Sequence, residues 1–455
     1  MENWRKIYFL GIGGIGMSAL ARYFNKRNVH CIGYDKTKTP LTEKLEAEGI
    51  QIHYEDRPDL IPIDCDLVIY TPAIPKNLKE FLFVVEKKFD LKKRSEVLGI
   101  ITNHRKSIAV AGTHGKTSTS ILISHILVQT KLGVSAFLGG IAANYKSNYI
   151  DQGENIVVLE ADEYDRSFLQ LKPDLTIINS LDADHLDIYG SREEMVETYL
   201  RFARQIKPGG TLLLYEGIAE EEKQKFIQIG VKLIEFGLKG KLRAEIKSWD
   251  QKEINFDYCD NENFVIPKLS LPLAGKHNVI NAVAAIKACL IAGVKPQNIG
   301  QAIASFKGVS RRFELVYSGK NITLIDDYAH HPTELAAAIS AAKMHYPDKK
   351  ITGIFQPHLY SRTRDFMEEF AQVLGALDQL ILVEIYPARE EPINGISSNS
   401  LFENIILEKK YICLQKELTD LLKTLDLEVV MTLGAGDLDL RLDEIKACLI
   451  NKYES

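Results

Sequence analysis

The stretch "AVAGTHGKTSTS" constrains the fold of this chain more than any other, because it predicts a strand, a turn and a helix in that order. The apolar run "SIAVAG" leads into the turn, and a helical pattern begins at Lys116. In such a turn, backbone N–H groups and the helix N-terminus behind them form a pocket for phosphate oxygens. We therefore predict that Lys116 neutralises the β- and γ-phosphates of a nucleotide and that the Thr117 hydroxyl binds Mg²⁺.

This second glycine loop of the chain is shorter than the standard pattern G-x-x-x-x-G-K-[ST]. Val110 stands where the first glycine would be, while Gly112, Gly115, Lys116 and Thr117 keep the order of the rest. A chance Gly-Lys-Thr at the start of a helix is the alternative interpretation. The complete order of strand, loop and helix favours the phosphate site.

Acidic residues follow the next strands of the same segment, where a nucleotide site needs them. Glu160 ends the apolar run "NIVVLE". The run after it ends in three polar residues, Asp182, Asp184 and His185. Mg²⁺ prefers oxygen ligands, so a carboxylate at a strand end beside the loop, Glu160 first of all, is a candidate ligand. The alternative is that the neighbouring acids are solvated loop residues or helix caps: Asp162, Glu163 and Asp165.

The first glycine loop of the chain has the pattern G-x-G-x-x-G, at Gly11, Gly13 and Gly16, after the apolar run "KIYFLGIG". Asp35 ends the next strand about 19 residues beyond Gly16, which matches the ribose-binding acid of a dinucleotide fingerprint. This pattern indicates a nucleotide diphosphate. An NAD enzyme, however, needs no second phosphate loop with Lys-Thr and metal acids. Two phosphate sites imply two phosphate-bearing ligands, one of which is hydrolysed.

A third group of polar residues gathers at the ends of apolar runs in the last part of the chain. It comprises Arg311, Arg312, Asp326, Asp327, Tyr328, His330, His331, His358 and Arg362. Ligands of open parallel sheets sit at the carboxyl ends of strands, and the planar fork of arginine suits phosphate or carboxylate groups. The two adjacent histidines could form a metal pair or shape a turn. Without cysteine or a matching His/Glu spacing, the turn is favoured.

Short apolar runs alternate with helical patterns along the chain, which is typical of α/β proteins with parallel sheets. The pattern restarts near 104 and again near 309. We therefore predict three α/β domains, over residues 1–104, 105–309 and 310–455. Residues 240–272 are richer in charge and shorter in period, so we expect a small antiparallel excursion there.

Composition excludes several classes of function. The 56 basic and 61 acidic residues give a net charge of −5 and are interspersed, so we expect no nucleic-acid partner. No uninterrupted apolar stretch approaches the ~18 residues that cross a bilayer, and the first residues lack the layout of a signal peptide. The six cysteines are scattered without C-x-x-C pairs, as reduced thiols are. We expect a cytoplasmic protein with no membrane partner.

Several motifs, taken in order along essentially the whole chain, resemble the Mur ligase family. They are "GIGGIGMS", "TPAIP", "AGTHGKT", "EADEYDRSF", "DADHLDIYG", "GKHNVINAVAA", "RRF", "DDYAHHPTE", "FQPHLYSRT" and "LGAGD". The resemblance implies a Rossmann-like N-terminal domain that binds UDP, a central phosphate-loop ATPase domain with a mostly parallel sheet, and a Rossmann-like C-terminal ligase domain. Within the family, the N-terminal "GIGGIGMS" points to ATP- and Mg²⁺-dependent ligation of L-alanine to the lactyl carboxylate of UDP-N-acetylmuramate. This reaction passes through an acyl phosphate, releases ADP and phosphate, and belongs to peptidoglycan precursor synthesis.

The resemblance also implies roles for individual residues. The catalytic residues would be Lys116, Glu160, His185, Arg311, Arg312 and His358. ATP would be bound by Gly112, Thr113, His114, Gly115, Lys116, Thr117, Ser118, His277, Asn278, Asn281 and Asp327. The acceptor and L-alanine would be bound by Gly11, Gly13, Gly14, Gly16, Ser18, Asp35, His53, Thr71, Tyr328, His358 and Arg362. Metal ions would be held by Thr117, Glu160 and His185.

Two positions depart from the family pattern. Leu359 stands where relatives commonly carry arginine, and "YPAREEP" replaces the more usual Ala-Gly-Glu, around Arg389 and Glu390. We expect small-molecule substrates and a monomer or weak homodimer. Two other classes stay open: an NAD-dependent oxidoreductase with a regulatory ATP site, and a catalytically silent nucleotide-binding regulator.

Overall fold

The computed structural model describes residues 4–182, 189–249, 253–261, 264–273, 275–388 and 390–454. His185, a predicted metal ligand, and Arg389, in the departing loop, lie outside the described residues. The chain divides into two compact units. The described residues up to Gly308 form most of the first unit, and residues 309–388 and 390–454 form most of the second.

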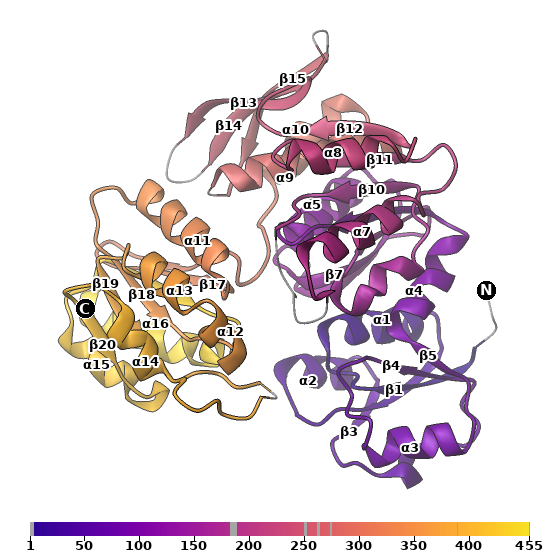
Figure 1. Ribbon diagram of the computed structural model, residues 1–455, viewed down its shortest axis with the longest axis horizontal. Helices are drawn as coiled ribbons and strands as arrows, with labels where there is room; N and C mark the ends of the chain where they lie inside the picture. The colour runs from indigo at the N-terminus through magenta and orange to yellow at the C-terminus, as the bar shows by residue number, and fades with distance from the viewer. Residues whose placement is uncertain are drawn as a thin grey trace. The chain divides into compact units, whose positions relative to one another are not determined.

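The first sheet of unit one lies in the indigo and violet part of the ribbon in Figure 1. It has five parallel strands in the order β3-β2-β1-β4-β5. Its strands are β1 (Lys6–Leu10), β2 (His30–Tyr34), β3 (Gln51–His53), β4 (Leu67–Tyr70) and β5 (Leu91–Lys93). Its helices are α1 (Ile15–Asn25), α2 (Pro40–Ala47), η1 (Pro58–Leu60), α3 (Lys79–Glu86) and α4 (Arg94–Asn103). Residues 7–10 of the central strand have no exposed surface, as expected for a parallel sheet covered on both faces. The carboxyl ends of β1, β4 and β5 lie at the same edge of the sheet, and the residues that directly follow them there are Gly11, Thr71 and Arg94.

The second sheet of unit one has seven strands in the order β12-β11-β10-β6-β9-β7-β8. They are β6 (Lys106–Ala111), β7 (Val134–Ala142), β8 (Ser147–Asp151), β9 (Ile156–Glu160), β10 (Leu175–Ile178), β11 (Thr211–Tyr215) and β12 (Lys232–Phe236). Its helices are α5 (Lys116–Gln129), η2 (Tyr164–Gln170), α7 (Arg192–Ala203), α8 (Glu220–Ile227), α9 (Lys276–Ala292), η3 (Pro296–Asn298) and α10 (Ile299–Ala304). Only β8 runs antiparallel among the described strands of this sheet. The prediction of a mostly parallel sheet is confirmed, but the β7–β8 hairpin was not predicted.

Helix α1 of the first sheet packs on the β7–β8 hairpin of the second. Arg22 and Ser18 of α1 both bond the Asn148 side chain, and the Ser18 hydroxyl accepts from Asn148 Nδ2 at 2.8 Å. Arg27 forms ion pairs with Asp151 at 3.2 Å and Glu154 at 2.7 Å. These contacts explain why the first two predicted domains form one compact unit.

A three-stranded antiparallel sheet completes unit one, in the order β13-β14-β15. Its strands are β13 (Leu242–Trp249), β14 (Ile254–Asp260) and β15 (Phe264–Leu271). All three strands lie within residues 240–272, so the small antiparallel segment predicted there is confirmed.

Unit two has a six-stranded sheet in the order β16-β17-β21-β18-β19-β20, in which only β16 is antiparallel among the described strands. The strands are β16 (Glu314–Ser318), β17 (Thr323–Asp327), β18 (Ile351–Phe355), β19 (Gln379–Leu382), β20 (Lys410–Ile412) and β21 (Val429–Leu433). The helices are α11 (Pro332–His345), α12 (Tyr360–Asp365), α13 (Met367–Leu374), α14 (Ser398–Asn404), η4 (Gln415–Glu417), α15 (Leu418–Thr424), η5 (Leu438–Arg441) and α16 (Leu442–Tyr453). Polar residues follow the carboxyl ends of β17 and β18, as predicted.

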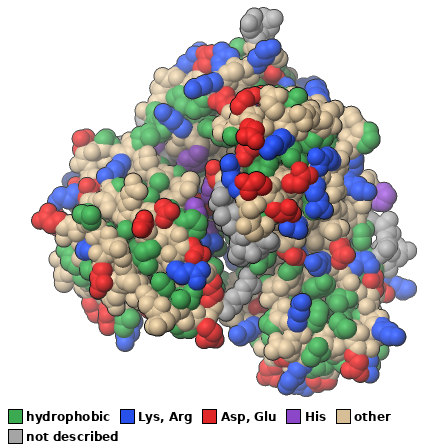
Figure 2. Space-filling view, viewed as in Figure 1, with side chains coloured by type: hydrophobic (Ala, Val, Ile, Leu, Met, Phe, Trp, Pro, Cys, Tyr) green, Lys and Arg blue, Asp and Glu red, His purple; other side chains and the backbone are tan. Residues whose placement is uncertain are grey.

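Basic and acidic side chains are interspersed over the face seen in Figure 2. None of the described helices combines the length and the apolar character needed to cross a bilayer. All six cysteines are free thiols, and Cys31, Cys259 and Cys289 are buried.

Candidate active site

The second glycine loop joins β6 to α5 and has a backbone that demands glycine at two positions. Gly112 has φ +125°, and a Cβ there would lie 2.8 Å from the backbone nitrogen of Ser180. Gly115 has φ +79°, and its Cβ would lie 2.8 Å from Asn281 Oδ1. Both the left-handed backbone and the close approach of neighbours exclude larger residues. The loop is therefore shaped by its glycines and packed against the end of β10 and the start of α9.

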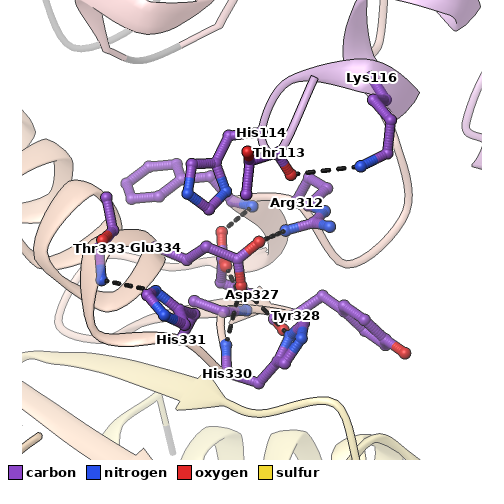
Figure 3. A network of polar contacts seen from close by, with 12 residues as sticks. Thr113, His114, Lys116, Arg312, Asp327, Tyr328, His330, His331, Thr333 and Glu334 are labelled. Atoms are coloured by element: carbon purple, nitrogen blue, oxygen red, sulfur yellow. Dashed lines mark hydrogen bonds and ion pairs between the residues drawn. The ribbon is translucent and has the colours of Figure 1, made fainter. Parts of the chain in front are cut away.

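Lys116 lies at the start of α5 and folds back over this loop. Its ammonium donates to the carbonyl oxygen of Gly112 at 2.7 Å. It also donates to the carbonyl oxygen of Thr113 at 3.3 Å (Figure 3). It also forms an ion pair with Glu163 Oε1 at 2.8 Å. Burial opposes the charge of the ammonium, but Glu163 and Glu160 outweigh it and hold the pKa of Lys116 above its usual value. The loop thus contains a fixed, charged lysine.

Glu163 is a residue whose importance the sequence reasoning missed, because it was explained equally well as a solvated loop acid. The residue is 4% exposed, and burial raises the pKa of its carboxyl to about 7. Its Oε2 has no hydrogen-bond partner among the described residues. The only signal for it in the sequence is its spacing, three residues after Glu160.

Glu160 ends β9 beside the same helix. Its Oε2 accepts from the backbone N–H of Gly139 at 3.0 Å, and the Thr117 side chain is hydrogen-bonded to it. Burial raises the pKa of the Glu160 carboxyl. Thr117 and Glu160, two of the three predicted metal ligands, are therefore adjacent. The described residues hold no cluster of three or more His, Cys, Asp or Glu side chains suited to a metal, and His185 is outside them.

Other predicted nucleotide residues surround the loop. Thr113 Oγ1 donates to the Asp182 carbonyl at 2.8 Å, and the His114 backbone N–H donates to Ser180 Oγ at 2.8 Å. On α9, Asn278 and Asn281 are buried and His277 is exposed, while Ser118 lies in the first turn of α5. Of the α9 group, the structure brings Asn281 against the glycine loop.

The first glycine loop joins β1 to α1 and is braced by β2. Gly11 has φ +84°, and its N–H donates to the Tyr34 carbonyl at 2.8 Å. The N–H of Gly13 donates to Asp35 Oδ2 at 2.8 Å. Gly14 caps α1 without a side-chain hydrogen bond. The Asp35 carboxylate, predicted to contact the substrate, thus holds the loop itself.

The remaining acceptor residues of unit one lie in different surroundings. Thr71 is beside the first loop, where a Cβ on Gly11 would lie 3.2 Å from its methyl carbon. Ser18 is fully buried and its hydroxyl donates to the Ile15 carbonyl at 2.9 Å, which argues for a packing role. His53 Nε2 is 2.7 Å from the hydroxyl of Tyr8, which donates to the buried carboxylate of Glu80 at 2.6 Å.

The two candidate arginines of unit two differ in how they are held. Arg311, with φ +63°, is ion-paired to Asp326 at 3.0 Å and Asp439 at 3.2 Å, and it donates to the Gly434 carbonyl at 2.8 Å. Its guanidinium is therefore occupied within the unit. Arg312 has a single ion pair among the described residues, with Glu334 at 3.3 Å (Figure 3). This makes Arg312 the better candidate for a ligand's phosphate.

Residues that follow β17 form a connected polar turn (Figure 3). Asp327 accepts from the backbone N–H groups of Phe313 and Ala329, both at 2.7 Å, and burial raises its pKa to about 6. His330 Nδ1 is 2.9 Å from the Tyr328 carbonyl. The side chain of His331 caps α11, accepting from the N–H of Thr333 at 3.3 Å. The histidines shape the turn, as the favoured interpretation predicted.

His358 and Arg362 lie together after β18, with Arg362 Nη1 3.2 Å from His358 Nδ1. The His358 ring stacks on Tyr386 with centroids 5.7 Å apart. Glu390, in the departing loop, accepts from the backbone N–H of Ser361 at 3.0 Å and from its hydroxyl at 2.5 Å. The loop around residue 390 therefore supports the His358–Arg362 pair, a role that sequence reasoning left open.

Comparison with known protein families matches three consecutive parts of the chain. Residues 6–106 match "Mur ligase family, catalytic domain", residues 110–289 match "Mur ligase middle domain", and residues 311–437 match "Mur ligase, glutamate ligase domain". Together these matches extend over most of the chain.

Curated relatives match over nearly the full length. A protein of Christiangramia forsetii named UDP-N-acetylmuramate--L-alanine ligase is 42% identical over 458 residues, covering 99% of both chains. One of Phocaeicola vulgatus with the same name is 43% identical over 461 residues, again covering 99% of both.

Solved structures match equally far along the chain. The UDP-N-acetylmuramate-alanine ligase MurC from Thermotoga maritima is 27% identical, with a TM-score of 0.81 over 98% of this chain and 99% of the other. A murein peptide ligase from Psychrobacter arcticus shares the fold, with a TM-score of 0.74 at 21% identity over 98% and 99% of the two chains. The predicted family and fold class are confirmed, and the chain belongs to the Mur ligase family.

Proposed function

We propose that this protein joins L-alanine to the lactyl carboxylate of UDP-N-acetylmuramate, with hydrolysis of ATP to ADP and phosphate. The observation that carries this function is the full-length match to relatives named for that ligation, at 41–44% identity. The reaction makes a precursor of peptidoglycan and is supported by two glycine loops, one for each phosphate-bearing substrate.

The chemistry explains why a ligase needs both loops. A carboxylate is a poor electrophile, because its negative charge repels a nucleophile and it has no good leaving group. Transfer of the γ-phosphoryl group of ATP to the lactyl carboxylate gives an acyl phosphate. The amine of L-alanine then attacks the acyl carbon, and the tetrahedral intermediate collapses to the amide as phosphate leaves. Each stage concentrates negative charge, which the protein must balance.

Mur ligases use Mg²⁺ as well as ATP, and the residues present fit both. The glycine cradle and Lys116 suit the β- and γ-phosphates, while the adjacent Thr117 hydroxyl and Glu160 carboxylate offer the oxygen donors that Mg²⁺ prefers. When bound there, Mg²⁺ supplies positive charge to the transferred phosphoryl group. Lys116 would neutralise the charge of these phosphates, and Asn281 borders the loop on the side of α9. His185 is proposed as a further metal ligand, together with Thr117 and Glu160.

The first glycine loop is proposed to hold the UDP diphosphate. The N-terminus of α1, which has no side-chain cap, favours an anion beside this loop. Asp35 and Tyr34 keep the loop in shape through the bonds to Gly13 and Gly11. We assign Thr71 to the substrate side of this loop.

Unit two is proposed to contribute the remaining groups. Arg312 would contact phosphate and Asp327 the ribose of ATP, while Tyr328, His358 and Arg362 would serve the acceptor and L-alanine. Arg311 would act through the turn that it braces. We also propose that the three predicted segments, with boundaries near 104 and 309, are the functional domains of a cytoplasmic monomer or weak homodimer.

A phosphate-release assay tests the function. With ATP, Mg²⁺ and UDP-N-acetylmuramate, we expect phosphate release that depends on L-alanine within a panel of amino acids, with glycine and serine as the nearest competitors in size. Release that depends on a different amino acid would contradict the assignment of L-alanine. No release with any amino acid, together with binding of a nicotinamide dinucleotide, would overturn the ligase.

A further inference from the structure

We propose that Arg94 binds the diphosphate of the UDP-sugar at the first glycine loop. This inference rests on the proposed function, since it adds a residue to one of its substrate sites. Arg94 directly follows β5 and begins α4. Because β1, β4 and β5 are parallel, Arg94 emerges at the same edge of the sheet as the glycine loop after β1, where ligands of such sheets bind.

The Arg94 side chain lies against the first turn of α1. A Cβ on Gly16 would lie 2.7 Å from Nη1 of Arg94, 3.0 Å from Cζ and 3.1 Å from Cδ. The space that a side chain at residue 16 would need is therefore filled by the guanidinium. A larger residue at position 16 would therefore displace the guanidinium from its place beside α1.

The electrostatics of this position favour an anion. The N-terminus of a helix carries about half a positive charge, from N–H groups that lack partners within the helix. Helix α1 has no acidic residue in its first turn and no side-chain cap. A guanidinium beside such a terminus is repelled by it, and the Asp35 carboxylate at Gly13 and Asp162 at Arg94 offset part of that repulsion. A diphosphate suits this place, because it accepts from backbone N–H groups and from the fork of arginine at once.

The protein supplies only part of that negative charge. Arg94 Nη2 is ion-paired to Asp162 Oδ2 at 3.3 Å, and this is its one ion pair among the described residues. The Asp162 side chain is 42% exposed and the Arg94 side chain 18% exposed, so solvent weakens the pair. Asp162 also follows Glu160 by two residues. The guanidinium therefore joins the proposed diphosphate site to the segment that follows the proposed metal ligand, within unit one.

Calorimetric titration of the full chain with UDP and with UDP-N-acetylmuramate tests the proposal. For Arg94→Ala we expect the Kd of both ligands to rise by about tenfold or more, as for loss of a charge-assisted hydrogen bond. Arg94→Lys should retain part of the affinity, since it keeps the charge and loses the fork. Lys93→Ala is the matched control, because Lys93 is the adjacent cation and pairs with Asp165 at 3.1 Å. Its Kd for UDP should stay within about twofold of the wild type.

Two results would overturn the proposal. A loss confined to UDP-N-acetylmuramate would assign Arg94 to the sugar's carboxylate. Unchanged affinity for both ligands, with a lower Tm, would show that Arg94 only stabilises the fold through its ion pair with Asp162. Should Arg94→Ala fail to fold, Arg94→Gln provides the same comparison with the side-chain stem retained. Wild-type protein that binds UDP through Arg94 yet releases no phosphate with L-alanine would contradict the proposed function and leave this inference standing.

Discussion

At the scale of single residues, the proposed chemistry depends on how Lys116 is held before ATP arrives. Three oxygen atoms surround its ammonium, two from loop carbonyls and one from Glu163. An ammonium has three N–H donors, so these contacts occupy all of them. A phosphate that binds Lys116 must replace at least one. Glu163, as the only charged partner among the three, is the one whose replacement changes the electrostatics most.

We predict that Lys116→Ala abolishes ADP formation and leaves UDP-sugar affinity within about twofold. The lysine belongs to the second glycine loop, and the UDP diphosphate is assigned to the first. Coupled ADP detection and UDP-sugar titration measure the two effects, with the exposed Lys172→Ala as control. If the variant lost UDP-sugar affinity but kept its turnover, Lys116 would not belong to the ATP site.

For Glu163→Gln we predict a lower Tm without nucleotide, by several degrees, because removing one member of a buried ion pair costs about 3–5 kcal/mol. A nonhydrolysable ATP analogue should then raise the Tm of the variant more than that of the wild type, since phosphate supplies the missing anion. Thermal unfolding with and without the analogue measures both shifts. An analogue effect equal to or below the wild-type effect would show that Glu163 does not compete with phosphate for Lys116.

At this scale, the sequence predicts those site residues whose roles follow from spacing within one motif. Lys116, Thr117 and Glu160 were predicted from a loop and a strand end, and the structure brings them together. Glu163 and Arg94 were missed for a physical reason. The burial of Glu163 and the contact of Arg94 with Gly16 depend on residues distant along the chain. The dinucleotide fingerprint indicates that Asp35 lies beside the first glycine loop, and the structure has it there. Its carboxylate, however, accepts a hydrogen bond from the loop N–H of Gly13.

At the scale of elements, most residues with proposed roles lie at or just after the carboxyl ends of strands, and helices cover the sheets that these strands form. The fold class followed from alternating apolar runs and helical patterns, since parallel strands buried on both faces have a clear apolar signature. The β7–β8 hairpin escaped prediction, because its strands include two glycines and several polar residues: Ser135, Gly139, Gly140, Ser147 and Asn148. The partner that buries this hairpin, α1, is more than 100 residues away in sequence.

Helix α3 adds a pH-dependent contact to the first sheet. Its Glu80 is fully buried, accepts from the Tyr8 hydroxyl and from the Arg57 N–H, and has its pKa raised by burial to about 7. A carboxyl whose pKa is higher in the folded state than in the unfolded state stabilises the fold most at pH values below its unfolded pKa, which is 4.5 for Glu80. Its contribution to the free energy of unfolding then declines as the pH rises toward 7.

We therefore predict that Glu80→Gln removes part of the loss of stability between pH 4.5 and 7, on the order of 2 kcal/mol. Chemical unfolding at a series of pH values measures this difference between variant and wild type. Glu86→Gln on the same helix is the control, because its side chain is 76% exposed. A Glu80→Gln profile parallel to that of the wild type would exclude a titrating Glu80.

At the scale of the whole molecule, residues with proposed roles in one reaction occur in both compact units. The acyl phosphate must meet the amine of L-alanine before it meets water. We predict that ATP analogue and UDP-N-acetylmuramate together reduce the radius of gyration in solution, as in other enzymes that close around their substrates. Small-angle scattering with neither, either and both ligands measures this. A radius that stays constant in all four samples would contradict closure.

In the proposed reaction, an acyl phosphate links ATP hydrolysis to amide formation. The most direct test uses UDP-N-acetylmuramate with ¹⁸O in both oxygens of its lactyl carboxylate. Phosphorylation makes one of these oxygens the bridge to phosphorus, and amide formation then leaves it with the phosphate. Mass spectrometry should therefore find one ¹⁸O in each released phosphate and the other in the new amide. Phosphate without ¹⁸O, or the label in AMP, would contradict the mechanism.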